Sequence, residues 1–294
     1  MIQILTIFAK LTLWRYRPKI VAITGSVGKT STKDAIATVL AVKYSVRATL
    51  GNYNNEIGVP LTIINEETAG KNGLLWAWVF LKAFLKLIYT DYPQVLVLEI
   101  GTDRPGDISH LMDLLGRVDV GVITYIGISH LEFFAHQHEL TKEKLSLIKK
   151  LPRDSAAVLN FDNQKIYDGK NQTKAEILGY GFNEHTNLNI SDFHIITDSE
   201  GSVGINFKIH HRGTVVPFFL PNALGKPMAY AAAAAAAVGL RLHIDLASAG
   251  TALRSYNPPP GRLRLLEGIK HTRIIDDTYN AAPDSTFSAL EALK

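Results

Sequence analysis

A turn rich in glycine and hydroxyl residues is the part of the sequence best suited to chemistry. The stretch from Ile20 to Lys33 reads "IVAITGSVGKTSTK", with four apolar residues before the turn and a Gly-Lys-Thr sequence that ends at Thr30. Backbone N–H groups in such a turn can point at an anion, and a helix that begins at Lys29 would add the positive end of its dipole. The Thr30 hydroxyl suits Mg²⁺, so the stretch predicts a site for a nucleoside triphosphate.

An ordinary glycine-rich turn between a strand and a helix is the alternative interpretation. The standard phosphate loop reads Gly-x-x-x-x-Gly-Lys, and Ile23 stands here at the place of its first glycine. The apolar run before the turn and the helix-like segment Asp34–Leu40 after it favour phosphate binding. The residues predicted to hold the nucleotide are Gly25, Ser26, Gly28, Lys29, Thr30 and Ser31.

The composition is that of a globular protein with an ordinary core. The chain has 294 residues, of which 47% are hydrophobic and 20% are charged. The net charge of +4 arises from 31 basic and 27 acidic side chains, too small an excess to predict binding to nucleic acid. Because cysteine is absent, a disulfide framework and a thiolate zinc site are excluded, and a cytoplasmic location is expected.

Two apolar segments raise the question of a membrane. The N-terminal run has its basic residues after the apolar stretch and is interrupted by Lys10, so it predicts a short packing helix rather than a signal or a spanning helix. The second segment, Leu74–Tyr89, has Lys82 and Lys86 on one helical face. It predicts either a helix packed on the domain with solvated lysines or a weak peripheral contact of residues 74–89 with a membrane surface.

Strand and helix signals alternate along most of the chain. The continuous apolar runs Val95–Ile100 and Val118–Tyr125 are typical of buried strands in a parallel sheet with helices on both faces. Glu99 and Thr124 fall near the C-terminal ends of these runs, at the sheet edge where ligands bind in open α/β folds. The predicted fold is therefore α/β, with a mostly parallel sheet.

The second half of the chain has a different pattern. Between Ala156 and Leu220 apolar and polar residues alternate, which predicts a small antiparallel β appendage. Seven alanines at 231–237 predict a close-packed helix, and "NPPPG" at 257–261 is the strongest break. We therefore divide the chain into an N-terminal helix at 1–19, a central domain at 20–261, and a short final segment at 262–294.

Four further strings, together with the phosphate loop, carry a resemblance to a known family. They are "GNYNNEIGVPLT" at 51–62, "LEIGTDRPGDI" at 98–108, "HLEFFAHQHELTKEK" at 130–144 and "PGRLR" with "IIDDTYNAAPDS" between 260 and 285. In this order they make the chain similar to the Mur ligases over roughly residues 19 to 294. The resemblance implies the central ATP-binding domain of that family, followed by the truncated start of a Rossmann-like C-terminal domain.

The resemblance also implies roles for individual residues. The loop lysine, Lys29, would bind the β- and γ-phosphates of ATP, and Thr30 and Glu99 would bind Mg²⁺. His130 matches a histidine at a second Mg²⁺, and Lys144 matches a lysine that the family carbamylates. Two Mg²⁺ ions and a carbamylated Lys144 are thus expected, with Lys29, Lys144, His130 and Arg262 as the catalytic set.

Other matches concern the nucleotide and the substrate. Arg262 matches an arginine near the terminal phosphate, Asp277 matches an aspartate that contacts the nucleotide, and Asn54 and Asn55 are expected to bind substrate. A family string that reaches the adenine is replaced by "GKPMAYA" at 225–231. Its residues Pro227, Met228 and Ala231 cannot make those hydrogen bonds.

The expected activity is an ATP-dependent amide ligation in peptidoglycan synthesis, carried out by a monomer. The strings "GNYNNEIGVP" and "DDTYNAAPDS" favour the branch of the family that joins D-alanyl-D-alanine to a UDP-N-acetylmuramoyl tripeptide. Another Mur-type ligase or a folylpolyglutamate-type ligase is one alternative. A truncated nucleotide-binding module without catalysis is the other, since residues 262–294 are too few for a typical domain.

Overall fold

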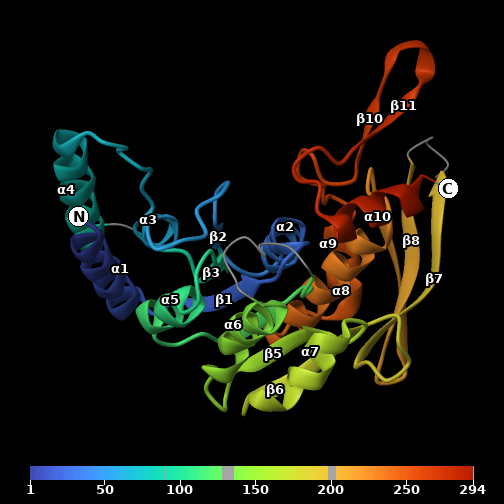
Figure 1. The fold of residues 1–294 in the computed structure, drawn as a ribbon, viewed down its shortest axis with the longest axis horizontal. Coiled ribbons are helices and arrows are strands. Elements are labelled where there is room, and N and C mark those ends of the chain that lie inside the picture. The colour runs from blue at the N-terminus through green and yellow to red at the C-terminus, as the bar shows by residue number, and fades with distance from the viewer. Residues whose placement is uncertain (90, 128–135, 198–202, 294) are drawn as a thin grey trace.

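The computed structural model describes residues 1–89, 91–127, 136–197 and 203–293 (Figure 1). Within them, nine strands form one sheet in the order β2-β3-β1-β4-β5-β6-β7-β8-β9. The strands in chain order are β1 (Lys19–Thr24), β2 (Val46–Ala48), β3 (Val95–Glu99), β4 (Val120–Ile123), β5 (Ala156–Asn160), β6 (Glu176–Gly181), β7 (Leu188–Thr197), β8 (Val203–His211) and β9 (Thr214–Pro221). All neighbours from β2 to β7 run parallel, whereas β8 runs antiparallel to β7 and β9.

The predicted fold class is confirmed, but the predicted start of the antiparallel region at Ala156 is wrong. Strands β5 and β6 belong to the parallel part, and antiparallel pairing begins only between β7 and β8. A helix precedes each of these two strands, α6 (Gln137–Lys149) before β5 and α7 (Gln164–Gly169) before β6. Such helices return the chain to the same end of the sheet, which is how parallel neighbours are connected.

Alternate residues of the central strands face two separate cores. Val21 and Ile23 of β1 pack into a core beneath α2 (Lys29–Leu40), α8 (Lys226–Arg241) and α9 (Leu246–Leu253). Ile20 and Ala22 pack into the core on the opposite face, beneath a second group of helices. That group includes α1 (Ile2–Tyr16), α3 (Gly58–Ile64), α4 (Gly73–Tyr89), α5 (Asp107–Leu115) and α6.

The alanine run forms the close-packed helix that the sequence predicts. Residues 231–237 lie in α8 and are all buried in the core that α8 shares with α2. Gly239 marks how closely the two helices approach, because a Cβ atom there would lie 2.9 Å from Val39 Cγ1. Because these side chains are small, α8 packs closely against α2, the helix that follows the glycine-rich turn, and fixes its position.

The N-terminal helix packs against the domain as expected, through Leu5 and Ala9. Among the described helices, none is both long enough and apolar enough to cross a bilayer. Helix α4 packs on α1, but its lysines are not merely solvated: Lys82 and Lys86 both form ion pairs with the buried carboxylate of Glu66, at 2.8 and 2.6 Å.

The last part of the chain adds a small separate sheet. Strands β10 (Arg264–Glu267) and β11 (Arg273–Asp276) pair antiparallel and project away from the main sheet in Figure 1. The helix α10 (Pro283–Ala292) follows them, and two short 3₁₀ turns lie at Lys170–Gln172 and Ile269–His271.

Candidate active site

The glycine-rich turn connects β1 to α2 at the C-terminal edge of the sheet. Strand β1 ends at Thr24 and α2 begins at Lys29, with Gly28 in the left-handed region at φ 82°. The first N–H groups of a helix have no acceptor within the helix, so this turn can offer them to an anion. Gly25 is required by close packing, because a Cβ atom there would lie 2.0 Å from Thr124 Oγ1.

Two lysines converge on this turn from different elements. Lys29 Nζ donates a hydrogen bond to the Gly25 carbonyl oxygen at 2.9 Å, and Lys144 Nζ of α6 donates to the same oxygen at 3.1 Å. Lys144 is only 1% exposed. Burial, followed by the nearby charge of Lys29, lowers the pKa of Lys144 to about 7. The pKa of Lys29 is also lowered, mainly by burial, while the carboxylate of Glu99 opposes that shift.

Glu99 is the acidic centre of the site. It is the last residue of β3, and its side chain is only 4% exposed. One carboxylate oxygen accepts a hydrogen bond from Thr30 Oγ1 at 3.0 Å, and the other accepts from Asn54 Nδ2 at 3.2 Å. Because β1 and β3 are parallel neighbours, the two strand ends bring the Thr30 hydroxyl and the Glu99 carboxylate together. Carboxylate, hydroxyl and amide oxygens are the donors that Mg²⁺ prefers, so these residues fit the expected ion.

The loop between β3 and α5 completes the wall of the site. The Asp107 carboxylate accepts hydrogen bonds from the backbone N–H groups of Asp103 and Arg104, at 3.0 and 2.7 Å. Glu143, the neighbour of Lys144 on α6, accepts from the N–H groups of Gly106 and Ile108 at 2.9 and 2.8 Å. The loop is therefore held by the Asp107 carboxylate at the start of α5 and by the Glu143 carboxylate of α6, the helix that carries Lys144.

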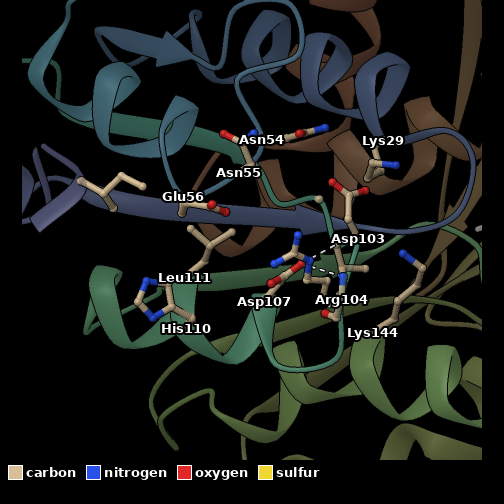
Figure 2. Close-up of a pocket in the computed structure, with 13 residues that line it drawn as sticks. Lys29, Asn54, Asn55, Glu56, Asp103, Arg104, Asp107, His110, Leu111 and Lys144 are labelled. Carbon is tan, nitrogen blue, oxygen red and sulfur yellow. Dashed lines mark hydrogen bonds between the residues drawn. The ribbon is translucent and has the colours of Figure 1, made fainter. Parts of the chain in front are cut away.

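A cavity of about 530 Å³ lies in front of these groups (Figure 2). Lys29, Asp103 and Lys144 line one part of it, and Figure 2 shows the Asp103 carboxylate pointing toward the Lys29 side chain. The charge of Asp103 opposes the lowering of the pKa of both lysines. The cavity continues past His110 to Ile2 at the start of α1. It thus has one end lined by charged groups at the glycine-rich turn and room for a larger molecule beyond them.

Sequence reasoning missed Asp103, Arg104 and His110 as wall residues. The string "GTDRPGDI" directly after Glu99 was the available signal, since a loop that follows a strand end in an α/β sheet faces the ligand edge. Only the position of α6, which holds this loop through Glu143, places the three side chains beside the cavity.

The two asparagines of the "NYNN" string differ in their contacts. Asn54 binds Glu99 through its side chain, and its carbonyl oxygen accepts from Gly101 N at 2.7 Å. Asn55 Oδ1 accepts from the N–H groups of Ile57 and Gly58, so it supports the start of α3. Both residues line the cavity, and their roles toward a substrate stay predictions.

The two serines predicted to bind nucleotide are buried in the framework of the turn. Ser26 Oγ accepts from Gly127 N at 3.1 Å, while Ser26 N donates to the Tyr125 carbonyl oxygen at 2.7 Å. The Ser31 carbonyl oxygen accepts from Tyr256 Oη at 3.3 Å. These contacts hold the turn in shape, and a direct role of either hydroxyl toward a nucleotide stays a prediction.

The final segment reaches the site through Arg262 and Tyr279. The Arg262 guanidinium lies 4.0 Å from the centre of the Tyr279 ring, and its charge contributes to the lowered pKa of Lys29. Tyr279 Oη donates to Asn52 Oδ1 at 2.8 Å, which connects the segment to the loop before Asn54. Asp277 accepts from Leu263 N at 3.2 Å, and burial raises the pKa of its carboxyl group.

One predicted site residue lies outside the described part of the chain, and the segment that departs from the family's adenine string lies away from the cavity. His130 lies outside the described residues, so its expected place beside a metal ion stays a prediction. Met228 and Ala231 are buried in the core beneath α8, and Pro227 lies in its first turn. The two buried side chains pack inside the protein rather than facing a ligand.

Comparisons with known proteins agree with this arrangement. The family model described as the Mur ligase middle domain matches residues 23–75 and 79–239. A UDP-N-acetylmuramoyl-tripeptide–D-alanyl-D-alanine ligase from Bacillus subtilis is 31% identical over 284 residues, which cover 96% of this chain and 54% of the relative. The corresponding ligase from Escherichia coli is 26% identical over 97% of this chain and 58% of its own length.

A solved structure is similar over nearly the whole chain. It is a MurF ligase from Thermotoga maritima in complex with ADP, with a TM-score of 0.81 and 29% identity, covering 99% of this chain and 60% of that one. The chain therefore spans between about half and three fifths of the length of these relatives.

Proposed function

This chain belongs to the Mur ligase family, and we propose that it binds ATP and serves the ligation of D-alanyl-D-alanine to a UDP-N-acetylmuramoyl tripeptide. The relatives from Bacillus subtilis and Escherichia coli, which are named after this reaction, match 96% and 97% of this chain. The structural neighbour from Thermotoga maritima holds ADP, which supports a nucleotide at the glycine-rich turn of this chain.

One observation carries the proposal. Four side chains from three separate elements meet at the turn: Lys29 and Thr30 from α2, Glu99 from β3 and Lys144 from α6. A buried carboxylate beside a hydroxyl suits a divalent cation, and two cationic amines suit a polyphosphate. The alternative is that these four side chains only stabilise the fold through ion pairs. That role would require neither the open turn nor the adjacent cavity.

The reaction proceeds in two displacements on this proposal. A carboxylate oxygen of the tripeptide attacks the γ-phosphorus of ATP, and ADP leaves with the electron pair of the broken P–O bond. The amine of D-alanyl-D-alanine then attacks the acyl carbon, the amine proton is lost, and phosphate leaves. Lys29 and Arg262 would neutralise negative charge on the phosphates. Thr30 and Glu99 would hold Mg²⁺, which would supply Lewis-acid polarisation of the transferred phosphoryl group.

Lys144 has a separate place in the proposal. An amine reacts with CO₂ only in its neutral form, forming an N–C bond and releasing a proton. The low pKa of about 7 leaves a large neutral fraction of Lys144 near neutrality. The resulting carbamate would be an anion, and it would help to hold a second Mg²⁺ together with His130.

Calorimetric titration with ADP in the presence of Mg²⁺ tests the nucleotide site. Lys29→Ala is expected to weaken binding strongly, whereas the exposed Lys142→Ala on α6 is the matched control and should bind like the wild type. Equal affinities for wild type and Lys29→Ala would refute the site.

A coupled assay for ADP release tests which pair of substrates the protein joins. UDP-N-acetylmuramoyl tripeptide with D-alanyl-D-alanine is compared with other muramoyl peptides and with a folate plus glutamate, using the longest natural form of the protein that contains this chain. Turnover only with a different pair would assign the protein to another branch of the family.

A further inference from the structure

Helices α1 and α4 form one exposed edge of the molecule. They lie side by side at the end of the structure farthest from α10 (Figure 1). The rings of Phe8 and Phe80 stack between them at 5.6 Å, and Tyr16 Oη of α1 donates to the Lys86 carbonyl oxygen of α4 at 2.5 Å. The pair is thus a fixed part of the fold rather than a loose appendage.

The outward side of α4 is entirely apolar. Its buried residues Trp76, Val79 and Ala83 face the core, and the exposed residues of the helix lie away from them. Leu74 is 85% exposed and Trp78 is 55% exposed. The exposed apolar side chains on this side include Leu74, Trp78, Leu81, Phe84, Leu85 and Ile88.

Helix α1 adds a second apolar stripe. Ile4, Ile7, Leu11 and Trp14 are all exposed, and Trp14 is 70% exposed. Their spacing of three and four residues places them on one side of the helix, opposite the buried Leu5 and Ala9. Exposed apolar side chains that gather on two neighbouring helices mark an interaction site.

The charged residues of α1 and α4 are all basic, although Glu67 and Asp91 are exposed beyond the two ends of α4. Neither α1 nor α4 contains an aspartate or a glutamate. The two lysines of α4 are partly exposed and both pair with the buried Glu66, so the exposed side chains of its outward side are apolar. Lys10, Arg15 and Arg17 are exposed on and just after α1, so cations border the apolar stripe.

We propose that the α1–α4 face docks on the surface of an anionic lipid bilayer. Leucine, isoleucine and phenylalanine side chains would enter the boundary between headgroups and acyl chains, with Trp14 and Trp78 at the depth that tryptophan favours. Lys10, Arg15 and Arg17 would meet anionic headgroups. Neither helix is long enough to span, so both would lie in the plane of the interface. The basic border favours this occupant over a second copy of the chain, which would bring like charges together.

Vesicle flotation tests the proposal. Wild type is expected to float with vesicles of phosphatidylcholine and phosphatidylglycerol, and about tenfold less with phosphatidylcholine alone or in high salt. The double variant Leu81→Asp/Phe84→Asp should lose binding by a similar factor. The control Val215→Asp, at an exposed apolar position on β9, should bind normally. Circular dichroism and binding of ADP with Mg²⁺ check that each variant is folded.

The three tryptophans give a second readout. Brominated acyl chains should quench Trp14 and Trp78 most, whereas Trp76 is only 5% exposed and lies on the core side of α4, so quenching should be weaker in the variant Trp14→Phe/Trp78→Phe. Failure to bind anionic vesicles, equal binding by Leu81→Asp/Phe84→Asp, or quenching of Trp76 alone that is as strong as that of the wild type would overturn the proposal. A dimer that this double variant dissociates, with no vesicle binding by wild type, would assign the face to a second copy instead.

Discussion

Lys29 and Lys144 donate hydrogen bonds to a single acceptor, the carbonyl oxygen of Gly25, at 2.9 and 3.1 Å. Two amines this close to each other repel when both are protonated, and burial adds to that cost. The carboxylates of Glu99 and Asp103 offset part of the repulsion. The positive charge of the two lysines is therefore only partly balanced by neighbouring carboxylates. An anion such as a polyphosphate or a carbamate would reduce the remaining repulsion.

The first prediction concerns how Lys144 changes the free energy of unfolding as the pH changes. Its pKa is about 7 in the folded state, against an ordinary value of 10.5. Between these values the unfolded chain binds a proton that the folded protein has released, so the free energy of unfolding rises with pH across this window. Lys144→Met should therefore be more stable than wild type by a few kcal/mol near pH 6, and this advantage should shrink by about pH 9.

Urea denaturation at the two pH values measures this difference. Lys142→Met, at an exposed position of the same helix, is the control and should show the pH dependence of the wild type. If the gap between Lys144→Met and wild type stays constant with pH, Lys144 does not titrate in this window.

The second prediction concerns the carboxylate that faces Thr30 and Asn54. Glu99→Gln keeps the size of the side chain but removes its charge, so the affinity for ADP in the presence of Mg²⁺ should fall by about 10- to 100-fold. In EDTA the variant and wild type should bind ADP with similar affinity. The exposed Asp113→Asn is the matched control. An equal loss with and without Mg²⁺ would mean that Glu99 shapes the turn rather than holding an ion.

The third prediction concerns the close contact between Gly25 of the turn and Thr124, the residue after β4. Gly25→Ala would place a methyl group 2.0 Å from Thr124 Oγ1, which the packed site cannot absorb. We expect destabilisation of about 1–3 kcal/mol and loss of ADP binding. Removing the hydroxyl in Gly25→Ala/Thr124→Ala should recover part of both losses, as a double-mutant cycle would show. Strict additivity of the two changes would argue against this steric account.

The fourth prediction concerns the residue next to Lys144. Glu143→Ala removes the carboxylate that accepts from Gly106 N and Ile108 N, leaving two backbone donors without that partner. The free energy of unfolding should fall by about 1–3 kcal/mol. Glu139→Ala, at an exposed position one turn earlier in α6, should change it by less than about 0.5 kcal/mol. Equal effects of the two substitutions would show that the contact with the loop contributes no stability.

Local patterns predicted most of the elements that carry the site. The continuous apolar runs before Gly25 and through Glu99 became β1 and β3, and the helix was expected to begin at Lys29, where α2 begins. These assignments succeeded because strand and helix signals depend on residues close together in the chain. The predicted antiparallel region begins too early, at Ala156, because no local pattern in β5 and β6 separates a parallel strand from an antiparallel one.

The sequence by itself determined the glycine-rich turn between β1 and α2, because its glycines, lysine and hydroxyls are neighbours in the chain and need only a strand before and a helix after. It also located Glu99 at a strand end. Only the tertiary structure decided that Lys144 meets the Gly25 carbonyl oxygen, that Asp103 faces Lys29, and that Glu66 draws Lys82 and Lys86 inward. The contacts of Lys144 and Asp103 join elements far apart in the chain and depend on the order β3-β1-β4 of the strands, whereas those of Glu66 depend on how α4 packs against the domain. Strand order arises from the burial of the whole sheet, which no single segment encodes.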